Sequence, residues 1–341
     1  MNSFNRAMSI SGAAWFETMR EHRAELDIEH LLLGLLGAGG GPAQTLAAHG
    51  VTLAAHGVTL ARARRAVTAV RAERLGDIGI DPTTVPVRDV RDMAGLTARE
   101  VGDLPMSRAA RDVLSQGPGW NPFSSGERRR RRRLRGADFE TGILRDLLAE
   151  PSGRIAAIIE HCGASVAALR ADATGGPVSG TGRGVRRAAP GVPRPARVLP
   201  GCWPGGEPAA AIAQSHFVSA DPARVRAVLE DPEQIRRIVG GGGVFRVDRQ
   251  PDPLGAIAWR VVFSGEEVDG KVPGPADQVT GYERFELMPV PGGTVVLYET
   301  ARRTYGRTAR LWALVARYSL RFAPRHRLLL LSDACARGED E

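Results

Sequence analysis

The chain has 341 residues, 43% of them hydrophobic, and a formal net charge of +8. This length allows two domains with separate cores, and no apolar run approaches the roughly 20 residues that a membrane-spanning helix needs. The basic balance favours an anionic partner, such as nucleic acid, an acidic peptide or anionic lipid, without choosing among them. Since Lys271 is the only lysine, we attribute the arginine excess to a GC-rich genome rather than to function.

The three cysteines, Cys162, Cys202 and Cys335, are far apart and show neither zinc-ligand spacing nor a disulfide framework. Their usage favours a reducing, cytoplasmic environment. Residues 1–10 lack a basic segment followed by a long apolar core, so we expect no secretory signal. The sequence also gives no reason to expect a metal or a cofactor.

The periodicity of the first half predicts a helical domain. Its densest apolar run begins after Asp27 and ends at Gly37, shortly before Pro42. An acid at the start and glycine at the end suit the two ends of a helix, and Ile28 and the leucines recur at helical spacing. Further helices are predicted over 60–75, over 106–116 with Ser107 as N-cap, and twice within 137–171.

A perfect seven-residue tandem copy occupies 45–51 and 52–58. Seven residues are close to two helical turns, but the glycine in each copy favours a lengthened loop. The copy also repeats a histidine, as His49 and His56. Because the duplication explains their spacing and no acidic or thiol ligand accompanies them, we do not expect a metal site.

An arginine-rich insertion over 117–136 is the most strongly charged part of the chain. Bound to an anionic polymer, its arginines would release counterions and give a salt-sensitive affinity. However, no aromatic stacking platform is interleaved with them, and we favour an exposed insertion over a nucleic-acid-binding loop. The arginines are Arg128, Arg129, Arg130, Arg131, Arg132, Arg133 and Arg135.

The composition changes at residue 173, where a Gly-, Pro- and Arg-rich stretch predicts a flexible linker that extends to 209. Beyond it the periodicity becomes that of strands, and a C-terminal helix follows that Pro324 should kink or split. The predicted order is a strand over 211–220, helices over 223–229 and 232–239, strands over 244–249, 256–264, 278–288 and 294–304, with a weaker strand at 267–272, and a helix over 308–336.

The helical half contains a weak internal repeat, with one copy over 28–36 (IEHLLLGLL) and another over 140–148 (ETGILRDLL). Residues 1–172 thereby resemble the double amino-terminal (Clp repeat) domain of the Clp-type AAA+ unfoldases, in which two four-helix units pack as a pseudo-dimer. The second copy departs from the family pattern, since Thr141-Gly142 replace Glu-His and the arginine insertion precedes it.

The resemblance implies binding of a substrate or an adaptor rather than catalysis. No Gly-x-x-x-x-Gly-Lys-Ser/Thr motif is present, so the chain lacks the phosphate-binding loop of an ATPase. Within the repeat motif we expect Glu29 and His30 to be structural, capping and hydrogen-bonding the start of the helix.

Residues 210–337 resemble the helix-grip superfamily of START, Bet v 1 and polyketide cyclase domains (SRPBCC). The resemblance is carried by the order of the predicted elements and by the opening VSADPARV over 218–225, followed by LEDP over 229–232. It implies an α+β fold with an antiparallel sheet around a long C-terminal helix. An apolar cavity between sheet and helix would suit a small hydrophobic ligand.

Nine apolar and aromatic residues are expected near that cavity, although ordinary core is an equally good interpretation: Trp259, Val261, Phe263, Phe285, Leu287, Leu297, Trp312, Val315 and Tyr318. The polar candidates are Tyr282, Glu283 and Glu299, with Tyr298 and Arg284. Alternation along a strand places Glu283 and Phe285 on one face and Tyr282 and Arg284 on the other. Lone carboxylates on strands are usually solvated, and we recognise no set of nucleophile, base and acid.

These observations predict a cytoplasmic, non-catalytic binding or adaptor protein. The helical module would dock a protein or peptide, such as the Clp machinery or its substrates, and the helix-grip domain would bind a small hydrophobic ligand. One alternative is a polyketide cyclase- or aromatase-like enzyme whose acid–base pair lies among Tyr282, Glu283, Glu299 and Tyr305. The other is a nucleic-acid-associated protein that uses the arginine run.

Overall fold

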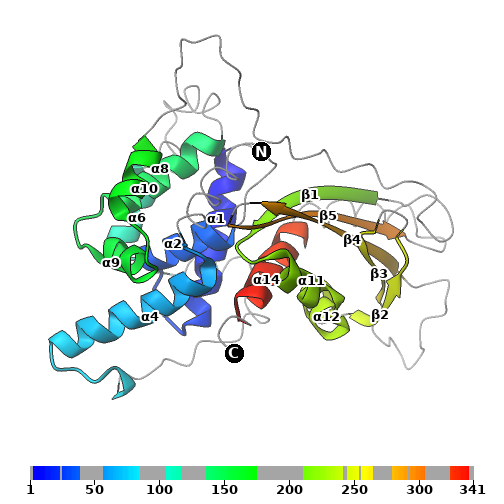
Figure 1. Ribbon diagram of the computed structural model, residues 1–341, viewed down its shortest axis with the longest axis horizontal. Helices are drawn as coiled ribbons and strands as arrows, with labels where there is room; N and C mark the ends of the chain where they lie inside the picture. The colour runs from blue at the N-terminus through cyan, green and yellow to red at the C-terminus, as the bar shows by residue number, and fades with distance from the viewer. Residues whose placement is uncertain are drawn as a thin grey trace, which may run out of the picture. The chain divides into compact units, whose positions relative to one another are not determined.

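The computed structural model divides the chain into two compact units (Figure 1). The first consists of helices, and the second of an antiparallel sheet with helices. The chain is therefore a multidomain protein in which a helical part precedes an α+β part. The described residues are 3–23, 25–38, 57–84, 105–116, 136–174, 210–240, 244–252, 255–263, 279–290, 292–303 and 323–337. Within these ranges, no helix is both long and apolar enough to cross a membrane.

The first unit has helices wherever the sequence predicts them within the described residues. One predicted helix is interrupted, because Gly163 adopts a φ of +77° that ends α9 before α10 begins. The elements are α1 (Ser3–Arg20), α2 (Ile28–Gly37), α4 (Leu60–Asp77), the short 3₁₀ helix η1 (Pro82–Thr84), α6 (Arg108–Gln116), α8 (Gly136–Leu148), α9 (Arg154–His161) and α10 (Val166–Thr174).

Helix α2 is the buried centre of this unit, and every residue from Ile28 to Gly37 is buried. Its closest neighbour is α1, which Gly34 contacts directly. A Cβ atom on Gly34 would lie 2.7 Å from the carbonyl oxygen of Ile10 and 2.7 Å from the backbone nitrogen of Ala14. The two helices therefore approach more closely than any side chain at this position would allow.

The segments that precede α2 and α6 pair with each other through a parallel bridge between Leu26 and Met106. The N–H of Leu26 donates to the oxygen of Pro105 at 3.0 Å, and the N–H of Ser107 donates to the oxygen of Leu26 at 2.9 Å. The Ser107 hydroxyl accepts from the N–H of Ala110 at 3.0 Å. This confirms Ser107 as the N-cap of α6 and places the starts of α2 and α6 side by side.

The second unit contains a five-stranded antiparallel sheet in the order β1-β5-β4-β3-β2. The elements are β1 (Ala210–Val218), α11 (Pro222–Glu230), α12 (Pro232–Gly240), β2 (Val244–Gln250), β3 (Ile257–Phe263), β4 (Val279–Val290), β5 (Gly293–Arg303) and α14 (Ala323–Arg337). The strands agree with the predicted ranges to within two residues, and the weaker predicted strand at 267–272 lies outside the described residues.

Figure 1 shows α11, α12 and α14 against one face of this sheet. The core between them contains Val225, Leu229 and Ile235 from the helices that follow β1, with Leu328 and Leu331 from α14. Pro324 lies in the first turn of α14, where its missing N–H leaves no hydrogen bond unmade. The described C-terminal helix thus begins at Ala323, directly before this proline, and the earlier part of the predicted helix over 308–336 lies outside the described residues.

Candidate functional site

A pocket of about 320 Å³ lies on the helical unit between α2, α4 and α9. Six of its residues recur every three or four positions along α4 and its C-cap, so they form one stripe on that helix. Five of the lining residues are apolar, three are arginines and one is a glutamate. The lining consists of Glu29, Val67, Val70, Arg71, Arg74, Leu75, Ile78, Arg154 and Ile158.

The stripe changes from buried to exposed along α4. Val67 and Val70 are buried, whereas Ile78 is 69% exposed. In Figure 1 the last turns of α4 extend beyond the neighbouring helices of the unit. Ile78 therefore extends the apolar stripe from the interior of the unit to the surface at the pocket.

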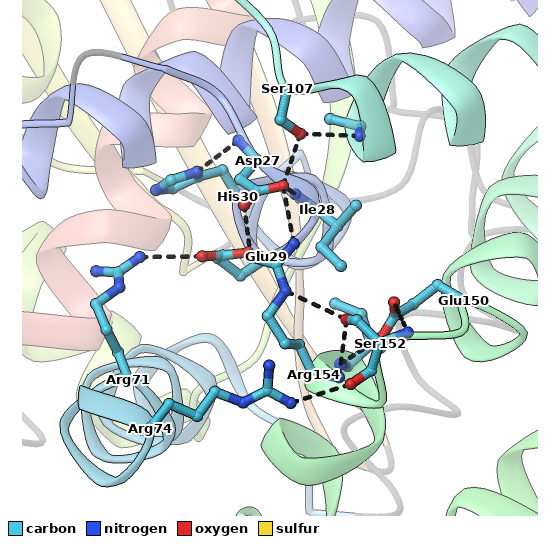
Figure 2. Close-up of polar contacts among 12 residues, drawn as sticks. Asp27, Ile28, Glu29, His30, Arg71, Arg74, Ser107, Glu150, Ser152 and Arg154 are labelled. Atoms are coloured by element: carbon cyan, nitrogen blue, oxygen red, sulfur yellow. Dashed lines mark hydrogen bonds and ion pairs between the residues drawn. The ribbon is translucent and has the colours of Figure 1, made fainter. Parts of the chain in front are cut away.

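Glu29 lies at the inner end of the pocket between two arginines (Figure 2). Its Oε1 accepts from Nη2 of Arg71 at 3.1 Å, and its Oε2 accepts from Nη1 of Arg154 at 3.2 Å. Arg154 also donates to both oxygens of Asp27, at 2.5 Å and 3.3 Å. The two arginines therefore neutralise the acids at the start of α2.

Asp27 caps α2 while it holds two other elements. Its Oδ1 accepts from the N–H of Ile28 at 2.8 Å and from the hydroxyl of Ser107 at 2.6 Å, and its own N–H donates to Nδ1 of His30 at 2.9 Å. Burial alone would raise the pKa of the Asp27 carboxyl, but the hydrogen bonds from Arg154 and Ser107 outweigh it and lower this pKa below its ordinary value. Asp27 thus stays ionised and joins the starts of α2, α6 and α9.

His30 has the capping role that the sequence predicts, because its Nδ1 accepts the N–H of Asp27. In the neutral ring this leaves the proton on Nε2, which lies 3.6 Å from Oε2 of Glu21. Glu29 behaves differently from the expectation. It forms ion pairs with Arg71 and Arg154 and does not cap the helix.

Arg74 is the lining arginine with the weakest partner. Its Nη2 donates to the carbonyl oxygen of Ser152 at 3.1 Å, which is a neutral group. The turn that contains Ser152 is fixed by Glu150, which accepts from the N–H of Ser152 at 2.8 Å and from that of Ile155 at 3.3 Å. Arg74 is also exposed, and Figure 2 shows its guanidinium directed toward Ser152.

The structure places most of the described cavity candidates of the sheet unit in one core. Trp259, Val261 and Phe285 belong to the cluster that packs against the helices, and Leu287 lies at its edge. Leu297 of β5 is buried on the other face of the sheet. It lies opposite Glu286 of β4, which points away from the face that carries Phe285. The Phe263 side chain and the whole of Trp312, Val315 and Tyr318 lie outside the described residues.

The polar candidates fall on both faces of the sheet. Glu283 faces the helices, next to Trp259 in the register of β3 and β4. Arg284 and Glu299 lie on the opposite face and form an ion pair at 3.2 Å. Arg284 also forms an ion pair with Asp252 at 2.8 Å. Tyr282 shares this second face with Ala258 and Ala301. The alternation expected along β4 is therefore confirmed. The expectation that strand carboxylates are solvated is wrong, since Glu283 and Glu299 are buried.

Glu283 belongs to a buried cluster that crosses from the sheet to α14. Its Oε1 accepts from Nη1 of Arg327 at 2.9 Å, and its Oε2 accepts from the hydroxyl of Tyr298. The same Nη1 donates to the Tyr298 hydroxyl at 2.9 Å. Burial would lower the pKa of Arg327, but Glu283 and Tyr298 raise it above its ordinary value. Arg327, on α14, was not among the residues singled out from the sequence.

Several residues singled out from the sequence cannot be placed. His49, His56, Tyr305 and the arginine run over 128–135 lie outside the described residues. Within the described part of the chain, no three His, Cys, Asp or Glu side chains are grouped as metal ligands would be.

Comparisons with known proteins find neither a matching family profile nor a matching curated sequence. Solved structures that resemble parts of the chain include the N-terminal domain of the chaperone ClpD from Arabidopsis thaliana, at 18% identity over 49% of this chain and 89% of that one, with a TM-score of 0.31. They also include the di-domain ARO/CYC StfQ from the steffimycin biosynthetic pathway, at 13% identity over 38% and 52%, with a TM-score of 0.25. Protein MLL2253 from Mesorhizobium loti matches at 17% identity over 36% and 97%, with a TM-score of 0.25.

Proposed function

We propose that this chain is a two-unit binding protein without turnover of its own. The helical unit is a Clp-repeat-like docking module that holds a peptide segment of another protein in the pocket on α4. The sheet unit is a helix-grip domain that holds a small hydrophobic ligand. The observation that carries the proposal is the stripe on α4, in which an exposed isoleucine continues a buried apolar face into a pocket.

The docking function is supported by the shape and chemistry of the α4 stripe. A groove that offers apolar side chains every three or four residues suits a peptide whose own apolar residues have a helical spacing. Val67 and Val70 lie three residues apart, as do Leu75 and Ile78, with Arg71 and Arg74 between the two pairs. Ile158 of α9 closes the other side of the pocket. The absence of a phosphate-binding loop from the sequence means that this chain would bind a partner without hydrolysing ATP.

A pair of isoleucine variants tests the docking function. Peptides are first enriched from a random 12-residue phage library against the full chain, and their affinities are then measured by fluorescence anisotropy. Ile78→Ser should weaken binding by about tenfold, because the apolar contact is lost. Ile80→Ser is the matched control, since Ile80 is 41% exposed but does not line the pocket. Failure to enrich any peptide, or equal effects of the two variants, would contradict the function.

The ligand half of the proposal is supported by the sheet unit's covering helices and by the buried Glu283, Tyr298 and Arg327 cluster within its core. A polar cluster in an apolar setting is the kind of group that orients a ligand in a cavity. Native mass spectrometry of the protein, before and after extraction with organic solvent, should show a bound hydrophobic small molecule that extraction removes. Identical masses in both spectra would count against this half.

An enzyme of the cyclase or aromatase type remains the alternative, and it has less support. Its acid–base pair would come from Tyr282, Glu283, Glu299 and Tyr305. Of the three described residues, Glu283 faces the helices while Tyr282 and Glu299 lie on the other face of the sheet. The sheet therefore separates Glu283 from the other two, and on their shared face Glu299 is already paired with Arg284.

A further inference from the structure

We infer that the α4 pocket selects acidic apolar peptides, with a peptide carboxylate on Arg74 and apolar side chains on the stripe beside it. This inference rests on the proposed docking function and specifies the chemistry of its partner. It is carried by the distribution of charge over the pocket, in which the carboxylates already have arginine partners, whereas Arg74 has only a neutral carbonyl as its partner within the described residues.

The acids of the pocket are unavailable to a basic ligand. Both oxygens of Glu29 are hydrogen-bonded, one to Arg71 and the other to Arg154. Arg154 also pairs with Asp27, and Arg71 pairs with Glu21 at 2.7 Å. A lysine or arginine of a partner would have to displace these buried or half-buried contacts, and their loss would leave internal charges unpaired.

Arg74 is in the opposite situation. Its partner within the described residues is the neutral carbonyl of Ser152, and its side chain is exposed. The acid next to it in sequence, Glu73, points toward His161, whose Nε2 lies 3.6 Å away. The other two lining arginines, Arg71 and Arg154, are paired with Glu21, Glu29 and Asp27, so Arg74 is the lining arginine that has no carboxylate partner within the described residues. A guanidinium with free donors is well suited to a carboxylate.

The apolar residues of the α4 stripe determine where the rest of the peptide would bind. On α4, Arg74 stands one turn from Val70 and one turn from Ile78 on the same stripe. A bound carboxylate would thus be flanked on both sides by apolar surface. The matching peptide carries one Asp or Glu within about a helical turn of two large apolar residues.

The library selection against the full chain gives the first test. The enriched 12-residue peptides should contain an excess of Asp and Glu next to Leu, Ile or Phe. For one enriched peptide, replacement of its acid by Gln or Arg should weaken binding, with the Arg version about tenfold weaker than the acidic one. This difference should shrink between 50 and 300 mM NaCl, since salt screens exposed charges.

Charge reversal on the protein gives the second test. Arg74→Glu should weaken the acidic peptide by about tenfold and strengthen the version with Arg. Arg108→Glu is the matched control, because Arg108 is 95% exposed at the start of α6, where a Glu is tolerated by the helix dipole. Arg74→Gln removes the charge without reversing it and should give an intermediate affinity for the acidic peptide. Circular dichroism of all variants separates loss of binding from loss of fold.

The outcomes distinguish this inference from the docking function on which it rests. Enriched peptides that are neutral or basic, or an Arg74→Glu variant that binds like Arg108→Glu, would overturn the inference and leave docking intact. A library from which nothing is enriched would overturn docking and the inference together.

Discussion

Glu21 and Glu299 show how burial and pairing compete at single residues. Burial would raise the pKa of Glu21, but its interactions with His30 and Arg71 outweigh this and lower it to about 2. For Glu299 the outcome is the opposite: burial raises the pKa by more than the charge of Arg284 lowers it. Arg284 is shared with Asp252, which lies closer to it than Glu299 does. Arg71 is likewise shared between Glu21 and Glu29, but Glu21 has two partners that lower its pKa, His30 and Arg71, whereas Arg284 alone lowers that of Glu299.

The lowered pKa of Glu21 predicts a specific acid sensitivity. Because the folded-state pKa of about 2 lies below the ordinary value of 4.5, ionised Glu21 stabilises the fold above pH 4.5 and loses this effect as the pH falls toward 2. The full effect is about 3 kcal/mol. Glu21→Gln should therefore lower the melting temperature of the helical unit at pH 7 and make it less dependent on pH between 5 and 3. The exposed Glu160 provides the control variant, Glu160→Gln. Equal pH slopes for the two variants would contradict the assignment.

At the residue level, the sequence predicted local relations better than distant ones. The capping role of His30 and the opposite faces of Glu283 and Arg284 follow from neighbours in the chain. Arg327 was missed because its partners, Glu283 and Tyr298, lie 44 and 29 residues away. Only the packing of α14 on the sheet brings these groups together, and the same packing buries a carboxylate that an isolated strand would leave in water.

Among the elements, α2 depends on a glycine that has two opposing effects. Within a helix, glycine costs up to about 1 kcal/mol relative to alanine. Gly34 nevertheless allows α1 to approach, since a Cβ would lie 2.7 Å from the α1 backbone. Backbone cannot move aside as a flexible side chain can, so the close approach outweighs helix propensity at this position.

Two glycine-to-alanine variants separate these effects. Gly34→Ala should destabilise the helical unit by about 1–3 kcal/mol through overpacking. Gly12→Ala on α1 should be neutral or slightly stabilising, because a Cβ there would meet nothing within 4 Å. Hydrogen exchange, followed by mass spectrometry on peptides from α1 and α2, measures the change in stability that each variant causes. Faster hydrogen exchange in Gly12→Ala than in Gly34→Ala would contradict the close packing of α1 on Gly34.

The elements themselves were largely predictable because their signals are local. Alternation and turn residues located the strands, and apolar spacing located α2 and α4. The division between α9 and α10 was not predicted, although Gly163 is present in the sequence, because the apolar spacing continues through it. The pocket was also missed, since it forms only where α2, α4 and α9 come together.

For the whole molecule, the two units carry separate cores, and this predicts separate unfolding. In the helical unit, Glu17 accepts from Arg64 at 2.6 Å and 3.0 Å, and both side chains are buried. In the sheet unit, Nε1 of Trp259 donates to the oxygen of Leu229 at 2.9 Å inside the core. These two contacts offer one destabilising change for each unit.

Differential scanning calorimetry of the full chain should show two transitions, each sensitive to one variant. Glu17→Ala removes the bidentate partner of a buried arginine, which costs about 3–5 kcal/mol and should lower one transition by roughly 10 °C. Trp259→Phe removes a buried hydrogen bond and some volume, which costs about 1–3 kcal/mol, and should lower the other by a few degrees. If both variants shifted one shared transition, the units would unfold cooperatively, and a molecule that binds one unit would then stabilise the other as well.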